Sequence, residues 1–325
     1  MKPIPVGITL PQGWLDEFPS NNSHEQFQFS KNVALEAEKI GYDAGYVYDH
    51  FVPHPSDNRN KTFFEAYTLL SAIAGITTKL RIGQIVTCNS FRHPSLLAKI
   101  TSTLDAISNG RLEFGIGAGW FEYEYNSYGY KFDQATSRIE QLDESITIIK
   151  KMWKNEKSSF QGRHYSIKNA ICNPKPLQKP HPPIMVGGAG NKLMEVVAKH
   201  ATRYNHPFGT PEILEEKIKL LKSKCKSIKR NHNEIENSVL LRVLIGKDKD
   251  EVKDIISKLK KKNESIAEFV IRSGDSIAIG TPDEVSSYLQ RYVKIGISYF
   301  IVNFIGMYNM EMLSLFAKKV RPTLK

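Results

Sequence analysis

The sequence contains little cysteine. Its 325 residues include only Cys88, Cys172 and Cys225, which lie far apart and form no CxxC pair. Neither a disulfide framework nor a cysteine-type zinc site is implied, and a reducing cytoplasm fits best. The apolar run Val6–Leu10 is too short for the core of a signal peptide, and no stretch approaches the roughly 20 apolar residues that cross a bilayer. We therefore expect a cytoplasmic protein that does not contact a membrane.

Several motifs of common enzyme classes are also missing. The nine histidines show no HExxH spacing, and there is no GxSxG or Walker motif. A zinc hydrolase is therefore disfavoured, and an α/β-hydrolase has no support. The first apolar run continues as Gly7-Ile8-Thr9-Leu10-Pro11-Gln12-Gly13, which does not match the GxGxxG expected of a dinucleotide-binding doubly wound sheet.

Positive charge is in excess, with 45 Lys and Arg against 34 Asp and Glu, a formal net charge of +11. The excess indicates an anionic partner without identifying it. Many lysines gather in 217–230 and 253–262, with few aromatic residues between them. Nucleic-acid readers need stacking or groove-reading groups as well, so we interpret these clusters as solvated helix faces and expect no nucleic-acid partner.

Short apolar runs alternate with amphipathic stretches along the whole chain. Eight runs read as strands, most of them apolar on both faces as in a buried parallel sheet: Val6–Leu10, Ala44–Tyr48, Leu80–Val86, Leu112–Ile116, Ile184–Gly187, Arg203–His206, Val239–Ile245 and Tyr299–Phe304. Helical sequence follows each run. The pattern predicts an α/β fold, a (β/α)₈ TIM barrel, with a doubly wound sheet as the alternative. We expect one domain over residues 1–325, with an insertion region, a proline-rich excursion, at about 158–183.

In such a barrel, functional residues lie at the carboxyl ends of the strands. Asp49-His50 follows the second strand, where a histidine suits proton transfer near neutral pH and the aspartate suits fixing a loop or orienting the imidazole. Gly187-Gly188-Ala189-Gly190 lies between a strand and a helix, an arrangement that suits a phosphate nest or a tight turn.

The fourth strand ends in a glycine-rich segment, Gly115-Ile116-Gly117-Ala118-Gly119-Trp120. Its glycines permit close approach of a ligand to the backbone, and Trp120 offers an apolar plane beside a flat ligand. The alternative is a glycine-rich turn with a core tryptophan. Glu122 and Glu124 follow, and on a helix only one of them faces the site. We name His50, Asp49 and Glu122 as the candidate catalytic residues.

At these positions the sequence resembles the luciferase-like family of flavin- or deazaflavin-dependent oxidoreductases. The resemblance rests on segments 45–51, 91–94, 117–122, 182–188 and 280–285, which span most of the chain in family order. The Asp-His-Phe form at 49–51 and Glu65-Ala66-Tyr67 resemble the coenzyme F420 branch more than the FMN branch.

The resemblance implies a barrel with an insertion region, a homodimer, and a tricyclic cofactor in the barrel mouth. It implies a non-prolyl cis peptide near Ile85–Val86. In the family's sugar-phosphate dehydrogenases a glutamate acid stands where this chain has Trp120, which puts that substrate in doubt. The residues implied around the cofactor are Ile85, Val86, Thr87, Cys88, Gly117, Trp120, Gly187, Gly188, Ala189, Gly190, Asn205 and His206.

These observations predict an F420-dependent oxidoreductase that moves a hydride between the cofactor and an unidentified small organic substrate, with His50 moving a proton. One alternative is an FMN-dependent monooxygenase of the same fold. Another is a non-catalytic barrel that binds a flavin-like ligand or a protein partner. Asp49-His50 favours the first over the second, and the glycine nest disfavours the third.

Overall fold

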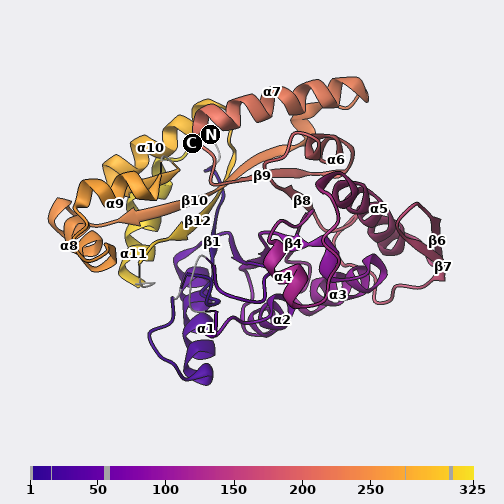
Figure 1. Cartoon of the computed structure of the whole chain (residues 1–325), viewed down its shortest axis with the longest axis horizontal. Helices are drawn as coiled ribbons and strands as arrows, with labels where there is room; N and C mark the ends of the chain where they lie inside the picture. The colour runs from indigo at the N-terminus through magenta and orange to yellow at the C-terminus, as the bar shows by residue number, and fades with distance from the viewer. Residues whose placement is uncertain (1–2, 16, 55–58, 275, 307–309) are drawn as a thin grey trace.

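Eight parallel strands close into a ring in the computed structural model, which describes residues 3–15, 17–54, 59–274, 276–306 and 310–325. β1 pairs with β2 on one side and with β12 on the other, and β9 pairs with β10, so the ring has no open edge (Figure 1). The ring strands are β1 (Val6–Thr9), β2 (Ala44–Val47), β3 (Arg81–Gln84), β5 (Leu112–Gly117), β8 (Ile184–Gly187), β9 (Arg203–Pro207), β10 (Glu236–Ile245) and β12 (Tyr299–Phe304).

This ring confirms the predicted (β/α)₈ barrel, and its strands are the eight that the apolar runs indicated. Every residue of β1, β2, β5, β8 and β12 is buried, as expected for parallel strands with side chains packed on both faces. The helices that cover the ring are α1 (Ser23–Ile40), α2 (Ala66–Ile76), α3 (Pro94–Ile107), α4 (Glu122–Ser127), α5 (Ala135–Lys154), α6 (Leu193–His200), α7 (Pro211–Ser227), α8 (Lys249–Leu259), α9 (Ile266–Ser273), α10 (Pro282–Lys294) and α11 (Met310–Leu315).

Local sequence explains where several helices begin and end. Asn22 caps the start of α1 by accepting from the backbone N–H of His24 and Glu25. Gly41 ends the same helix at φ 90°, a left-handed conformation that favours glycine. Pro94 and Pro211 occupy the first turns of α3 and α7, where the missing N–H costs nothing.

Three features lie outside the ring. The short strand β4 (Thr87–Cys88) pairs with β5 just after β3, and a cis peptide joins Ile85 and Val86 between β3 and β4, as the resemblance implied. β6 (Ser158–Gln161) and β7 (Ser166–Ala170) form an antiparallel hairpin within the excursion. β11 (Ile277–Gly280) pairs with the second half of β10 and was not predicted, because four residues give too little periodicity to recognise.

Charged side chains fill the amino-terminal end of the barrel. Arg203 Nη1 lies 2.7 Å from Glu113 Oε2, and Arg203 Nε lies 2.5 Å from Glu236 Oε2. Tyr46 and Tyr299 share a hydrogen bond of 3.0 Å beside them. This paired cluster occupies the amino-terminal end of the interior and leaves the carboxyl end for a ligand cavity. Among the helices of the described residues, none has both the length and the apolar character needed to cross a membrane.

Candidate active site

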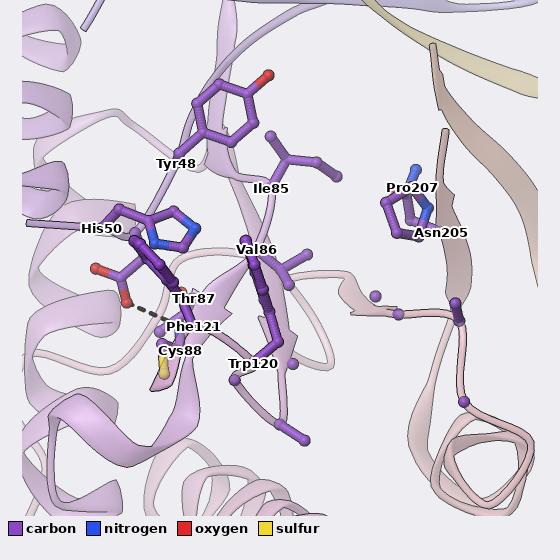
Figure 2. A pocket seen from close by; sticks show the side chains of 18 of the residues that line it. Tyr48, His50, Ile85, Val86, Thr87, Cys88, Trp120, Phe121, Asn205 and Pro207 are labelled. Atoms are coloured by element: carbon purple, nitrogen blue, oxygen red, sulfur yellow. Dashed lines mark hydrogen bonds between the residues drawn. The ribbon is translucent and has the colours of Figure 1, made fainter. Parts of the chain in front are cut away.

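A cavity of about 590 Å³ opens at the carboxyl ends of the strands. Residues at or after the ends of β1, β2, β3, β5, β8 and β9 line it, together with β4 and with Leu240 and Arg242 of β10. Figure 2 shows Tyr48 and His50 on one side and Asn205 and Pro207 on the opposite side, with Val86 between them. The predicted residues that line the cavity are Asp49, His50, Ile85, Val86, Thr87, Cys88, Gly117, Trp120, Gly187, Gly188, Ala189, Gly190 and Asn205.

His50 is held by a buried carboxylate. Its Nδ1 lies 2.7 Å from Oε2 of Glu124, whose side chain is fully buried. The other oxygen, Oε1, accepts from the backbone N–H of Phe51 at 2.6 Å and of Val52 at 3.1 Å. Because an ionised carboxylate only accepts hydrogen bonds, Nδ1 carries the shared hydrogen and Nε2 remains for a ligand. Trp14 stacks on the imidazole at 4.3 Å and fixes its plane.

Val86, Gly117 and Gly187 form an apolar floor between β4, β5 and β8, and Gly115 packs beneath it. A Cβ on Gly117 would lie 2.8 Å from Val86 Cγ2, and a Cβ on Gly187 would lie 2.7 Å from Val86 Cγ1. A Cβ on Gly115 would lie 2.0 Å from the carbonyl oxygen of Gln84. Only glycine therefore lets these backbones pack against the Ile85–Val86 segment. The result is a surface without polar side chains, which suits the face of a planar ring.

The predicted nest lies beside this floor. β8 ends at Gly187, and Gly188 has φ +145°, a conformation that side-chain-bearing residues rarely adopt. A Cβ on Gly190 would meet no atom within 4 Å, so the turn opens onto free space. Arg138 of α5 lines the same cavity, and its buried Nε has no hydrogen-bond partner among the described residues. An orphan guanidinium N–H near glycine N–H groups at a helix start suits an oxyanion.

The model of the luciferase-like monooxygenase family matches residues 13–299 of this chain. The chain belongs to this family, which confirms the resemblance.

Relatives of this luciferase-like chain use two cofactors. An F420-dependent glucose-6-phosphate dehydrogenase of Microbacterium testaceum is 26% identical over 92% of this chain and 95% of its own length. An FMNH₂-dependent dimethylsulfone monooxygenase of Pseudomonas putida is 22% identical over 91% of this chain and 88% of its own. The structure of an F420-dependent secondary alcohol dehydrogenase in complex with an F420–acetone adduct has a TM-score of 0.81 at 18% identity, with both chains fully covered. At 18% identity, the similarity to that structure shows a shared fold and no more.

Asp49 fixes the backbone of β4 in this luciferase-like chain. Its Oδ2 accepts from the N–H of Cys88 at 2.8 Å and from Arg92 Nη1 at 2.8 Å, and its Oδ1 accepts from Arg92 Nη2 at 3.0 Å. Burial acts to lower the pKa of Arg92, but the charge of Asp49 and their hydrogen bond raise it above its usual value. With both oxygens committed, Asp49 positions β4 rather than exchanging protons with a ligand. Of the two roles considered for it, the structure favours the loop-fixing one.

Two predicted residues lie outside the cavity lining of this luciferase-like chain. Glu122 is exposed at the first turn of α4, whereas Glu124 turns inward to His50, so the carboxylate of the site is Glu124. His206 is buried, but Asn205 and Pro207 on either side of it are the residues that line the cavity. Alternate residues of a strand face opposite sides, so His206 points away from the barrel interior. Its Nδ1 lies 3.1 Å from the carbonyl oxygen of Pro207.

Sequence reasoning also missed several lining residues. Trp14, His54 and Phe121 surround the mouth with Trp120, whose ring lies 5.3 Å from that of His54. Burial lowers the pKa of His54, and the neighbouring His50 adds to that effect. Arg242 was missed too, although a single charge inside the apolar run Val239–Ile245 was a visible signal.

Proposed function

We propose that the chain is an F420-dependent oxidoreductase that transfers a hydride between the deazaflavin and a small organic substrate. The observation that carries this proposal is the His50–Glu124 pair, which presents one ring nitrogen to a cavity with an apolar floor. The F420-dependent relatives, aligned over nearly the whole of both chains, support it. When bound, F420 supplies two-electron hydride chemistry, because a carbon replaces the flavin N5.

The described residues fit this cofactor. The floor made by Val86 and the glycines at 117 and 187 has the apolar surface that a tricyclic ring needs. The N–H of Gly188 donates to Asn205 O at 3.1 Å, so the N–H groups of Ala189 and Gly190 and the unpartnered Nε of Arg138 offer donors for the cofactor phosphate. Ile85, Thr87, Cys88, Trp120 and Asn205 complete the walls of this cofactor site.

His50 and Glu124 would move the proton that accompanies the hydride. Glu124 keeps hydrogen on Nδ1 and stabilises the imidazolium when Nε2 takes a proton. Asp49 holds the β4 backbone, and Trp14 fixes the imidazole plane. The aromatic side chains at the mouth exclude water, and the barrel orients the reactants.

An FMN-dependent monooxygenase is the second candidate, because the dimethylsulfone monooxygenase also aligns over most of this chain. Fluorescence titration of the protein with F420 and with FMN separates the candidates, and we expect tight binding of F420. Tight FMN binding without F420 binding would contradict the first proposal. Binding of neither would support the non-catalytic barrel.

We also propose that the protein is a homodimer. Exposed apolar side chains Ile76, Leu96 and Ile107 lie on α2 and α3, which are packed against each other. Single exposed apolar side chains are common on monomers, so the proposal rests mainly on the family resemblance. Analytical ultracentrifugation should give twice the mass of 36.9 kDa, and a monomer at micromolar concentration would refute the proposal.

A further inference from the structure

A lone positive charge faces the catalytic cavity from β10. Ser238, Leu240 and Arg242 are alternate residues of this strand and share its inner face. Ser238 accepts from Asn205 Nδ2 at 2.9 Å within the barrel, while Leu240 and Arg242 line the cavity. Arg242 is therefore the inward side chain that follows Leu240 along the cavity wall, and Leu244, the next residue of this face, packs against α8 and α9 instead. Its neighbours in sequence, Leu241 and Val243, are fully buried on the outer face.

Arg242 has no anionic partner among the described residues. No carboxylate there lies within 4.0 Å of its guanidinium, which is placed over the Phe208 ring at 4.7 Å. The side chain is only partly exposed. A cation in an apolar cavity loses hydration, and a stacked ring replaces little of it. The other arginine in the barrel interior, Arg203, contacts two carboxylates. The unpaired guanidinium therefore marks a position where a ligand supplies the negative charge.

Arg242 lies near the proton-transfer group rather than beside the nest. Its register partner on β12 is Asn303, whose Nδ2 donates to Tyr48 Oη at 3.1 Å, and Tyr48 lines the cavity two residues before His50. The ring order β8–β9–β10 separates Arg242 from Gly187–Gly190 by β9. Burial raises the pKa of Tyr48, and the charge of buried Glu17 adds to that effect. Glu17 Oε2 accepts from the N–H of Gly13 at 3.0 Å. Arg242 therefore lies apart from the nest, on a strand that β9 separates from it.

We infer that the substrate carries a carboxylate, which Arg242 binds while the reacting carbon lies near His50 Nε2. This inference rests on the proposed function. A guanidinium presents two parallel N–H donors that match the two oxygens of one carboxylate. Apart from Arg138 near the nest, no other Lys or Arg lines the cavity within the described part of the chain, and one guanidinium suits a single negative charge better than a phosphate dianion.

The test uses the F420-loaded protein and two probes of equal shape, benzoate and benzamide. Isothermal titration calorimetry should show that benzoate binds about tenfold more tightly than benzamide, since a charged hydrogen bond is lost with the amide. Arg242→Gln should abolish this preference, and Arg242→Lys should retain part of it. Arg291→Gln is the matched control, because Arg291 pairs with Glu212 on the surface, and it should retain the whole preference.

Three results would overturn the inference. The first is wild-type protein that binds F420 and shows no preference for benzoate, which would leave the proposed function intact. The second is an Arg242→Gln variant that binds F420 about tenfold more weakly, which would assign Arg242 to the cofactor tail. The third is Arg242-dependent binding of inorganic phosphate that is tighter than that of benzoate, which would assign a phosphate substrate. Failure of wild-type protein to bind F420, seen before any probe is added, would overturn the proposed function as well.

Discussion

Two arginines inside the same barrel have opposite surroundings. Arg203, at the amino-terminal end of β9, contacts Glu113 and Glu236 and is almost completely buried. Arg242, near the carboxyl end of β10, contacts an aromatic ring and no carboxylate among the described residues. A buried charge that serves the fold is paired within the fold, because an unpaired one costs several kcal/mol. The charge at the mouth lacks such a partner, which is the arrangement expected of a ligand site.

Replacing each arginine by Met gives the sharpest test of this difference. Arg203→Met takes one of two cations from buried Glu113, which keeps Arg81, and the cation of partly exposed Glu236, so it should lower the free energy of unfolding by about 3 kcal/mol. Arg242→Met should change it by less than about 1 kcal/mol. Urea denaturation of both variants measures the two effects. Equal losses would show that Arg242 is a structural residue.

A pair of histidines extends the comparison to catalysis. His50→Ala should keep the dissociation constant of F420 within several-fold, because the apolar floor and the nest remain. Turnover should fall about a hundredfold or more, since the proton-transfer group is gone. Steady-state assays with the true substrate, beside a fluorescence titration of the cofactor, measure both quantities. Unchanged turnover would remove the proton role of His50.

The second histidine, His206, should affect stability instead. Burial, with a smaller contribution from Lys217, lowers its pKa to about 4. Between about pH 6.5 and 4 the unfolded chain binds a proton that the folded chain does not, so stability decreases as the pH falls through this window. Wild-type protein should lose about 2 kcal/mol more than His206→Gln between pH 7 and 4.5. Urea denaturation measures the free energy of unfolding of both proteins at each pH. If wild-type protein and His206→Gln lost the same free energy over this range, the pKa of His206 would not be lowered in the folded protein.

The two glutamates of α4 provide the smallest contrast. Glu124→Gln removes the charge that stabilises protonated His50 and should lower turnover about tenfold. Glu122→Gln is the matched control and should leave turnover unchanged, since Glu122 is exposed outside the cavity. Equal behaviour of the two variants would place the functional carboxylate elsewhere.

Prediction from sequence succeeded where the signal is local. The eight ring strands were found because each is an apolar run bounded by polar or turn residues. The strand-end rule then selected Asp49, His50 and the glycine turns, which line one cavity. The rule failed for Glu122, where the outcome depends on the rotation of a short helix. The resemblance failed for His206, where the outcome depends on the face of a strand. A six-residue helix gives too few turns to fix its buried side from sequence.

The sequence alone determined three things: the barrel fold, the family, and the end of the barrel at which the candidate site lies. It did so because the order of the strands and the positions of the glycines are local features of the sequence. Tertiary structure alone decided which charges meet. Glu124 and His50 are 74 residues apart, and Arg203 and Glu113 are 90 apart. Closure of the ring brings these pairs together and leaves Arg242 without one among the described residues. Such pairings depend on side-chain directions in three dimensions, which no local pattern encodes.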